Sequence, residues 1–134
     1  MRIWQAIHSK LNATSAVTNI TGPRIYHGVR PSTDTGNYVI NYFQVAGEDI
    51  VLDTGGEVEN PVYQISCRAT TPANAEELAL IVSETLQNMK EDAGGFSINF
   101  VNLMPGGELI EEEDGEWYHV PLTMRFVFFN SEND

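Results

Sequence analysis

The chain has 134 residues, of which 42% are hydrophobic, and its 19 acidic residues against seven Lys+Arg give a formal net charge of -12. This length predicts one domain over 1–134, and the hydrophobic content excludes an intrinsically disordered chain. The charge argues against binding to nucleic-acid backbones or anionic membranes, which are polyanions, although acidic charge also keeps many small domains soluble.

Two short helices are predicted in the N-terminal region. Trp4, Ile7 and Leu11 recur at i, i+3 and i+7, which is the apolar stripe of an amphipathic helix. Residues 13–20 predict a second helix, and Gly22-Pro23 ends it. The following residues 24–26 predict at most a short strand, and residues 27–36 predict a loop.

A long hairpin is predicted from residues 37–52 and 57–70, joined by a turn at 53–56 that contains two glycines. Its apolar bases are Tyr38, Ile40 and Tyr42, facing Tyr63, Ile65, Cys67 and Ala69. Its tip, residues 47–60, has no Lys or Arg and carries five acids, Glu48, Asp49, Asp53, Glu57 and Glu59, around a short apolar step, Ile50, Val51 and Leu52. Pro61 predicts an edge position or a bulge in the returning strand.

Thr71-Pro72 predicts the start of the clearest helix, which Gly94-Gly95 would end. Its apolar face comprises Ala75, Leu78, Ala79, Val82, Leu86 and Met89. A strand from Phe96 to Leu103 leads into an acidic loop, 104–116, that includes Glu111, Glu112 and Glu113. The last strand, Trp117 to Phe129, alternates, with one face made of Tyr118, Val120, Leu122, Met124, Phe126 and Phe128.

These elements predict an α+β fold: an antiparallel or mixed sheet of about four to five strands, with a long protruding hairpin and helices on one face. Apolar residues also occur on the second face of the sheet, at Val39, Phe43, Val45, Trp117, Val127 and Phe129. Either another chain covers part of that face, which we favour for the aromatic residues, or these are ordinary scattered surface hydrophobics.

No motif in the sequence indicates catalysis. The three histidines, His8, His27 and His119, lack metal-ligand spacing, the serines lack a GxSxG setting, and the glycine pairs lack the context of a nucleotide-binding loop. Cys67 is the only cysteine, so an intramolecular disulfide is excluded and a buried free thiol is favoured. We therefore expect no enzyme activity, cofactor or metal.

The order of elements resembles the tail-completion, or tail-terminator, proteins of phages with long non-contractile tails. The resemblance extends over nearly the whole chain and is carried by Ala16-Val17-Thr18, Gly22, Arg24-Ile25-Tyr26, Tyr38-Val39-Ile40, the Val62-to-Ala69 strand, the Thr71-to-Leu86 segment and the alternating terminal strand. The acidic loop 104–116 has no counterpart among these family features.

The resemblance implies a structural virion protein that forms a homo-oligomeric, usually hexameric, ring on the head-proximal end of the tail tube. Such a ring would end tube polymerisation, contact the major tail tube protein and a head-completion or neck protein, and let DNA pass through its lumen without specific binding. We expect the hairpin tip and loop 104–116 to be its contact surfaces. The implied location is the virion tail, with the host cytoplasm during assembly.

Two other functions remain open on the sequence. One is a different neck or connector ring subunit of the same virion. The other is a small acidic protein that mimics DNA and inhibits a nucleic-acid enzyme, although the acids concentrate in two loops rather than over a broad face. The N-terminus is too polar for a signal peptide, and no apolar run approaches the roughly 20 residues that span a bilayer.

Overall fold

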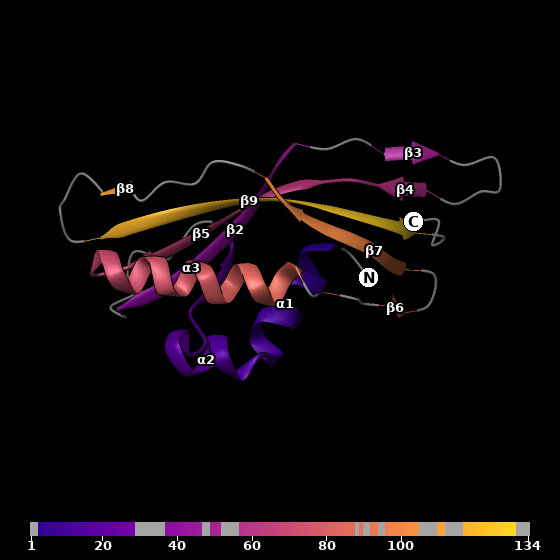
Figure 1. The fold of residues 1–134 in the computed structure, drawn as a ribbon. Helices are drawn as coiled ribbons and strands as arrows, with labels where there is room; N and C mark the ends of the chain where they lie inside the picture. The colour runs from indigo at the N-terminus through magenta and orange to yellow at the C-terminus, as the bar shows by residue number, and fades with distance from the viewer. Residues whose placement is uncertain are drawn as a thin grey trace.

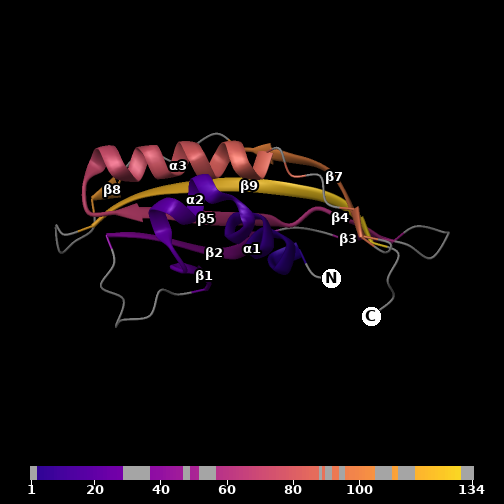
Figure 2. The same ribbon diagram turned by 90° about the horizontal axis from the view of Figure 1, so that it is seen from below.

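A computed structural model describes residues 3–28, 37–46, 49–51, 57–87, 89, 92–93, 96–104, 110–111 and 117–130. In these residues one open, mixed sheet carries three helices on one of its faces (Figures 1 and 2). In chain order the elements are α1 (Ile3–Ala13), α2 (Ser15–Thr21), β1 (Ile25–His27), β2 (Tyr38–Ala46), β3 (Asp49–Val51), β4 (Glu57–Glu59), β5 (Val62–Ala69), α3 (Pro72–Gln87), β6 (Asp92–Ala93), β7 (Phe96–Leu103), β8 (Ile110–Glu111) and β9 (Tyr118–Asn130).

The predicted long hairpin is confirmed. β2 and β5 pair antiparallel from Tyr38 opposite Ala69 onward, with a register shift between Gln44 and Ala46. β3 and β4 then continue the same hairpin, with Asp49 opposite Glu59. The predicted apolar base is also correct, because Ile40 faces Cys67 across the strands and both are fully buried.

β9 organises the sheet because it pairs antiparallel with strands on both of its edges. β5 and β4 follow one edge in a single register, while β7 and β8 pair with the other. β1 lies beside β2 and runs parallel to it, which makes the sheet mixed, and β6 pairs with β7. The sheet order therefore agrees with the predicted α+β class.

Pro61 does not lie at an edge, which corrects the first alternative of the prediction. It is buried between β4 and β5, and both of these strands pair with β9. Its carbonyl oxygen accepts a hydrogen bond of 3.0 Å from the backbone N–H of Phe126. The proline has no N–H to donate, so it falls at a break in the returning strand, while the bulge lies in the neighbouring β2.

The start of α3 is as predicted and its end is not. The Thr71 hydroxyl accepts a hydrogen bond of 3.3 Å from the backbone N–H of Asn74, as an N-cap does. The helix ends at Gln87, and the short strand β6 follows and pairs with β7. Gly94-Gly95, outside the described residues, thus falls between two paired strands rather than at the end of a helix.

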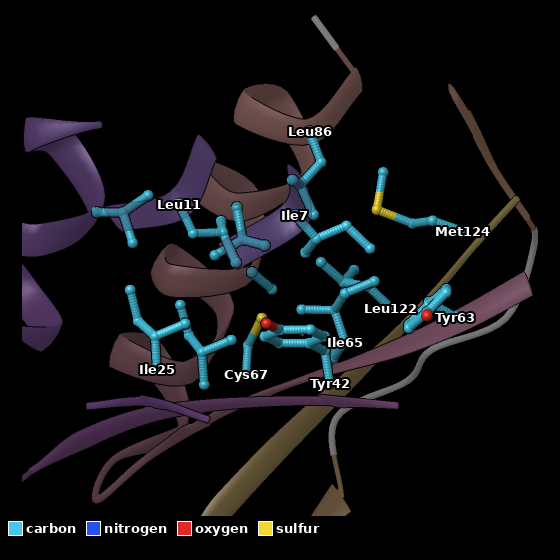
Figure 3. Packing of buried hydrophobic residues seen from close by; sticks show 14 of the residues in the cluster. Ile7, Leu11, Ile25, Tyr42, Tyr63, Ile65, Cys67, Leu86, Leu122 and Met124 are labelled. Carbon is cyan, nitrogen blue, oxygen red and sulfur yellow. Dashed lines mark hydrogen bonds between the residues drawn. The ribbon is translucent and has the colours of Figure 1, made fainter. Parts of the chain in front are cut away.

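The hydrophobic core fills the space between the helices and one face of the sheet (Figure 3). Ile7 and Leu11 of α1 and Leu86 of α3 point toward the side chains of Ile65 and Leu122. The inward face of β9 is the predicted one: its residues from Val120 to Phe128 at every second position are buried. No helix in the described part of the chain is long and apolar enough to cross a membrane.

Candidate assembly surfaces

The acidic hairpin tip is one of the two contact surfaces expected from the sequence. Asp49, Ile50 and Val51 form β3, and Glu57 and Glu59 are the outer residues of β4. The expected residues Glu48, Leu52 and Asp53 lie outside the described residues.

The described strands show how this tip is held. β4 pairs with the last three residues of β9, with Glu57 opposite Asn130 and Glu59 opposite Phe128. Figure 1 shows β3 and β4 together at one end of the sheet, beyond the stretch that the helices cover. The described residues of the hairpin tip, in β3 and β4, therefore extend the central strands of the sheet.

Glu59 connects this tip to the core electrostatically. It is half-buried, and its carboxylate raises the pKa of Tyr63, in addition to the larger effect of the burial of Tyr63 itself. Burial and a nearby negative charge both disfavour the ionised form of a tyrosine hydroxyl. Glu59 thus lies close enough to Tyr63 for the charge of its carboxylate to act on that side chain.

Loop 104–116 is the second expected surface, and only Met104 and β8 of it are described. Glu111 is in β8, opposite Tyr118 at the start of β9. Glu112 and Glu113 lie outside the described residues. In Figure 1, β8 lies at the end of the sheet opposite to β3 and β4.

The structure therefore does not bring the two acidic segments together. Glu111 pairs with Tyr118 and Glu59 pairs with Phe128, ten residues further along β9. At about 3.4 Å per residue these positions are roughly 34 Å apart. The molecule has two separate acidic ends.

Between these ends, the face of the sheet that the helices leave uncovered carries a polar network that the sequence analysis did not identify. The Arg68 Nε donates a hydrogen bond of 3.1 Å to the Asn41 side-chain oxygen. The Asn41 amide nitrogen donates one of 3.0 Å to the Gly28 carbonyl, so Asn41, although only 5% exposed, is paired. In the sequence, Arg68 occurs between apolar residues in a strand without acids, and this pattern could have indicated a polar contact on that face.

This helix-free face is also where apolar residues were noted in the sequence. Val39 and Trp117 are buried, whereas Phe43 and Val127 are half-buried and Val45 is 49% exposed. Nothing is described of the Phe129 side chain. The face therefore mixes half-buried apolar groups with the polar network.

A row of aromatic rings ties β1 to α1 and β2. The ring of His27 stacks between Trp4, at a centroid distance of 4.7 Å, and Tyr42, at 5.2 Å. Because His27 belongs to β1, the prediction that it begins a loop is wrong. Burial, with a smaller contribution from Tyr63, raises the pKa of Tyr42, whose hydroxyl donates a 3.1 Å hydrogen bond to the Trp4 carbonyl.

The described side chains offer little reactive chemistry. Burial raises the pKa of the Cys67 thiol, which disfavours the thiolate that reacts and binds metals. Among the residues that the structure describes, no group of three or more His, Cys, Asp and Glu could hold a metal ion. The features that remain are surfaces: two acidic ends and a helix-free sheet face.

A search of solved structures finds a protein with a similar fold. A chain in a structure of the virion of a native gene transfer agent particle is similar over 94% of this chain and 93% of its own length, with a TM-score of 0.71 and 18% sequence identity. At that identity the similarity establishes the fold. No curated protein sequence matches.

Membership of a family rests on the sequence itself. The family model described as "Tail completion protein gp17" matches residues 5–128, which is nearly the whole chain and leaves out only the first two residues of α1 and the last two of β9 among the helices and strands. The match agrees with the resemblance noted from the order of elements. The chain belongs to this family of tail completion proteins, which are structural proteins of the phage virion rather than enzymes.

Proposed function

We propose that this protein caps the head-proximal end of a phage tail tube as a ring, ends polymerisation of the tube and forms the surface to which the head is joined. The observation that carries the proposal is the family match over residues 5–128, because tail completion is the role in the family's description. The separation of the two acidic ends by about 34 Å supports it, since a joining protein needs two contact surfaces that do not overlap.

The two ends have different physical tasks in this proposal. One binds the growing face of the tube, and the other presents the head's neck proteins with a surface to which no further tube subunit can bind. Ile50, Val51 and Leu52 supply apolar anchors at the hairpin end, within an acidic surround that restricts the choice of partner. Each end then recognises one class of virion protein.

Charge supports the passage of DNA through such a ring. Each copy carries a formal net charge of -12, and a hexamer repeats the five acids of the hairpin tip around its axis. Negative charge along a lumen repels the phosphate backbone, so the DNA moves through without being retained.

Polymerisation of purified tail tube protein tests the capping role. Adding this protein at far less than one copy per tube subunit should stop elongation and leave labelled protein at one end of each tube in electron micrographs. Unchanged growth, or label distributed along the tube walls, would refute tube capping and would favour a neck or connector role instead.

Reversing the charge of the hairpin tip tests the role of its acids. We expect Asp49→Lys together with Glu57→Lys to reduce the number of particles that contain joined heads and tails, because the tip would lose its charge match and attract DNA. The control for added positive charge is Ser9→Lys, Asn12→Lys, Ser15→Lys and Asn19→Lys together, which add the same four charges at exposed positions of α1 and α2, away from the proposed contact surfaces. Normal joining and normal DNA ejection with the tip variant would show that the tip acids have no role.

A further inference from the structure

The acids of this chain are absent from the long strands β2, β5 and β9 at the centre of the helix-free face. The segments 38–46, 62–69 and 117–130 contain no Asp or Glu, although the whole chain has 19. They contain two of the seven basic residues, Arg68 and Arg125. On a strongly acidic protein, this face is locally uncharged to basic.

The surroundings of Arg125 show that its charge is not matched by its neighbours in the sheet. Arg125 is half-buried in β9, opposite Val62 on one side and Asn102 on the other. The next residues on the same face of β9 are Thr123 and Val127. None of these cross-strand or same-face neighbours is a carboxylate, the partner that a partly buried guanidinium usually finds.

The opposite side of the molecule has the complementary chemistry. α3 contains Glu76, Glu77 and Glu84 and no basic residue, and all three glutamates are exposed. Leu80 lies between them on the helix, one turn from Glu76 and one from Glu84, and is 59% exposed. An apolar side chain that is exposed among acids is the composition of an interface anchor with a polar rim.

We propose that the exposed surface of α3 in one copy docks on the helix-free face of the next copy, with Leu80 over Pro121, which lies between Arg68 and Arg125 in the strand register, and the glutamates near these two arginines. Because the two surfaces lie on opposite sides of one chain, the contact is heterologous and generates a ring when the rotation closes. This assignment rests on the proposed ring and names the surfaces that would build it.

The dimensions of the two surfaces agree. Arg125 is opposite Val62 on β5, six residues from Arg68, which places the arginines roughly 20 Å apart. Glu76 and Glu84 are about 12 Å apart along the helix. The arginines therefore lie a few ångströms beyond either end of the acidic stretch, which the long arginine side chain can span.

The contact also agrees with the placement of the other surfaces. Both acidic ends of the sheet stay free for the tube and the head. The arginines are covered by the neighbouring copy, so they cannot retain DNA, which an exposed basic face in the lumen would do. Each sheet would then have helices on both faces, its own on one and the neighbour's on the other.

A photo-crosslinker at position 80 tests the contact. A benzoylphenylalanine replaces Leu80 in cells that produce particles, and irradiation is followed by recovery of any covalent dimer and mass spectrometry of the joined peptides. We expect a band of twice the chain mass, joined from position 80 to residues 62–69, 110–111 or 117–130. In an Arg125→Glu background its yield should fall by at least about tenfold, whereas Arg125→Lys should retain it.

Each other result overturns the proposed contact. These results are the absence of a dimer, attachment to any residue outside 62–69, 110–111 and 117–130, and a yield that does not respond to Arg125→Glu. Circular dichroism of the purified variants separates loss of contact from loss of folding. The crosslink tests the contact between copies and the gene deletion tests tail capping, so the two can fail separately. Tails of normal length in particles made without this gene would refute the capping role and would leave the crosslink result unchanged.

Discussion

Tyr42 shows how one side chain joins three parts of the fold. It is fully buried in the core, stacks on His27 of β1 and donates a hydrogen bond to the Trp4 carbonyl of α1. The sequence predicted its inward direction from the alternation of the strand. It could not predict the hydrogen bond, because Trp4 is 38 residues away in the chain.

Removing the Tyr42 hydroxyl measures that link. We expect Tyr42→Phe to lower the free energy of unfolding by about 1 kcal/mol, because the hydrogen bond to Trp4 is lost while the ring stays packed. Urea denaturation measures the change. Tyr38→Phe, on the same strand and half-buried, is the matched control and should change it by less than about 0.5 kcal/mol. Equal effects of the two substitutions would show that the Tyr42 bond contributes nothing.

Alkaline pH should destabilise the protein through Tyr42, Tyr63 and the buried Cys67. The pKa values of the two tyrosines are raised above the ordinary value of 10.0 and that of the Cys67 thiol above 9.0, so over this alkaline range the unfolded chain releases protons that the folded chain still holds. The free energy of unfolding therefore falls as pH rises through this range. Urea midpoints between pH 8 and 11 measure the fall, and Tyr42→Phe should make it shallower. A midpoint that stays constant would contradict the raised pKa values.

At the scale of elements, α3 separates the demands of folding from those of assembly. Leu78 is fully buried, while Leu80, two residues further along, is 59% exposed. We expect Leu78→Ala to cost about 3 kcal/mol of unfolding free energy, because it leaves a cavity in the core. Leu80→Ala should change stability by less than about 0.5 kcal/mol. Chemical denaturation compares the two, and a large loss of stability with Leu80→Ala would mean that this side chain serves the fold.

The N-cap of the same helix is a second test of local structure. The Thr71 hydroxyl satisfies the N–H of Asn74, so Thr71→Ala should lower the free energy of unfolding by about 1 kcal/mol. Thr71→Ser keeps the hydroxyl and should restore most of the loss, as thermal or urea unfolding can measure. If serine were no better than alanine, the methyl group rather than the cap would be the cause.

Most elements could be predicted because their patterns are local. The alternation in β9 and the stripe of α3 report which side is buried wherever one face packs against a core. The failures have non-local causes. His27 is in a strand because β2, far along the chain, accepts β1 as a parallel neighbour, and α3 ends early because β6 pairs with β7. Pro61 is tolerated inside the sheet because the strand breaks there.

At the scale of the whole molecule, the acidic segments were predictable from composition and their arrangement was not. The sequence indicated that the hairpin tip and loop 104–116 carry the acids, but their separation at opposite ends of β9 depends on which strands pair. The basic character of the helix-free face was also missed. Arg68 and Arg125 come to lie on the same face of the sheet only because β5 pairs with β9.

The central claim is that this tail completion protein ends tube growth and permits joining of the head. Electron microscopy of particles from a phage that lacks this gene tests it most directly. We expect tail tubes longer than normal and full heads without tails, and both defects should disappear when the gene is supplied in trans. Tails of normal length that fail to attach would place the protein in the neck instead, and intact infectious particles would contradict the structural role altogether.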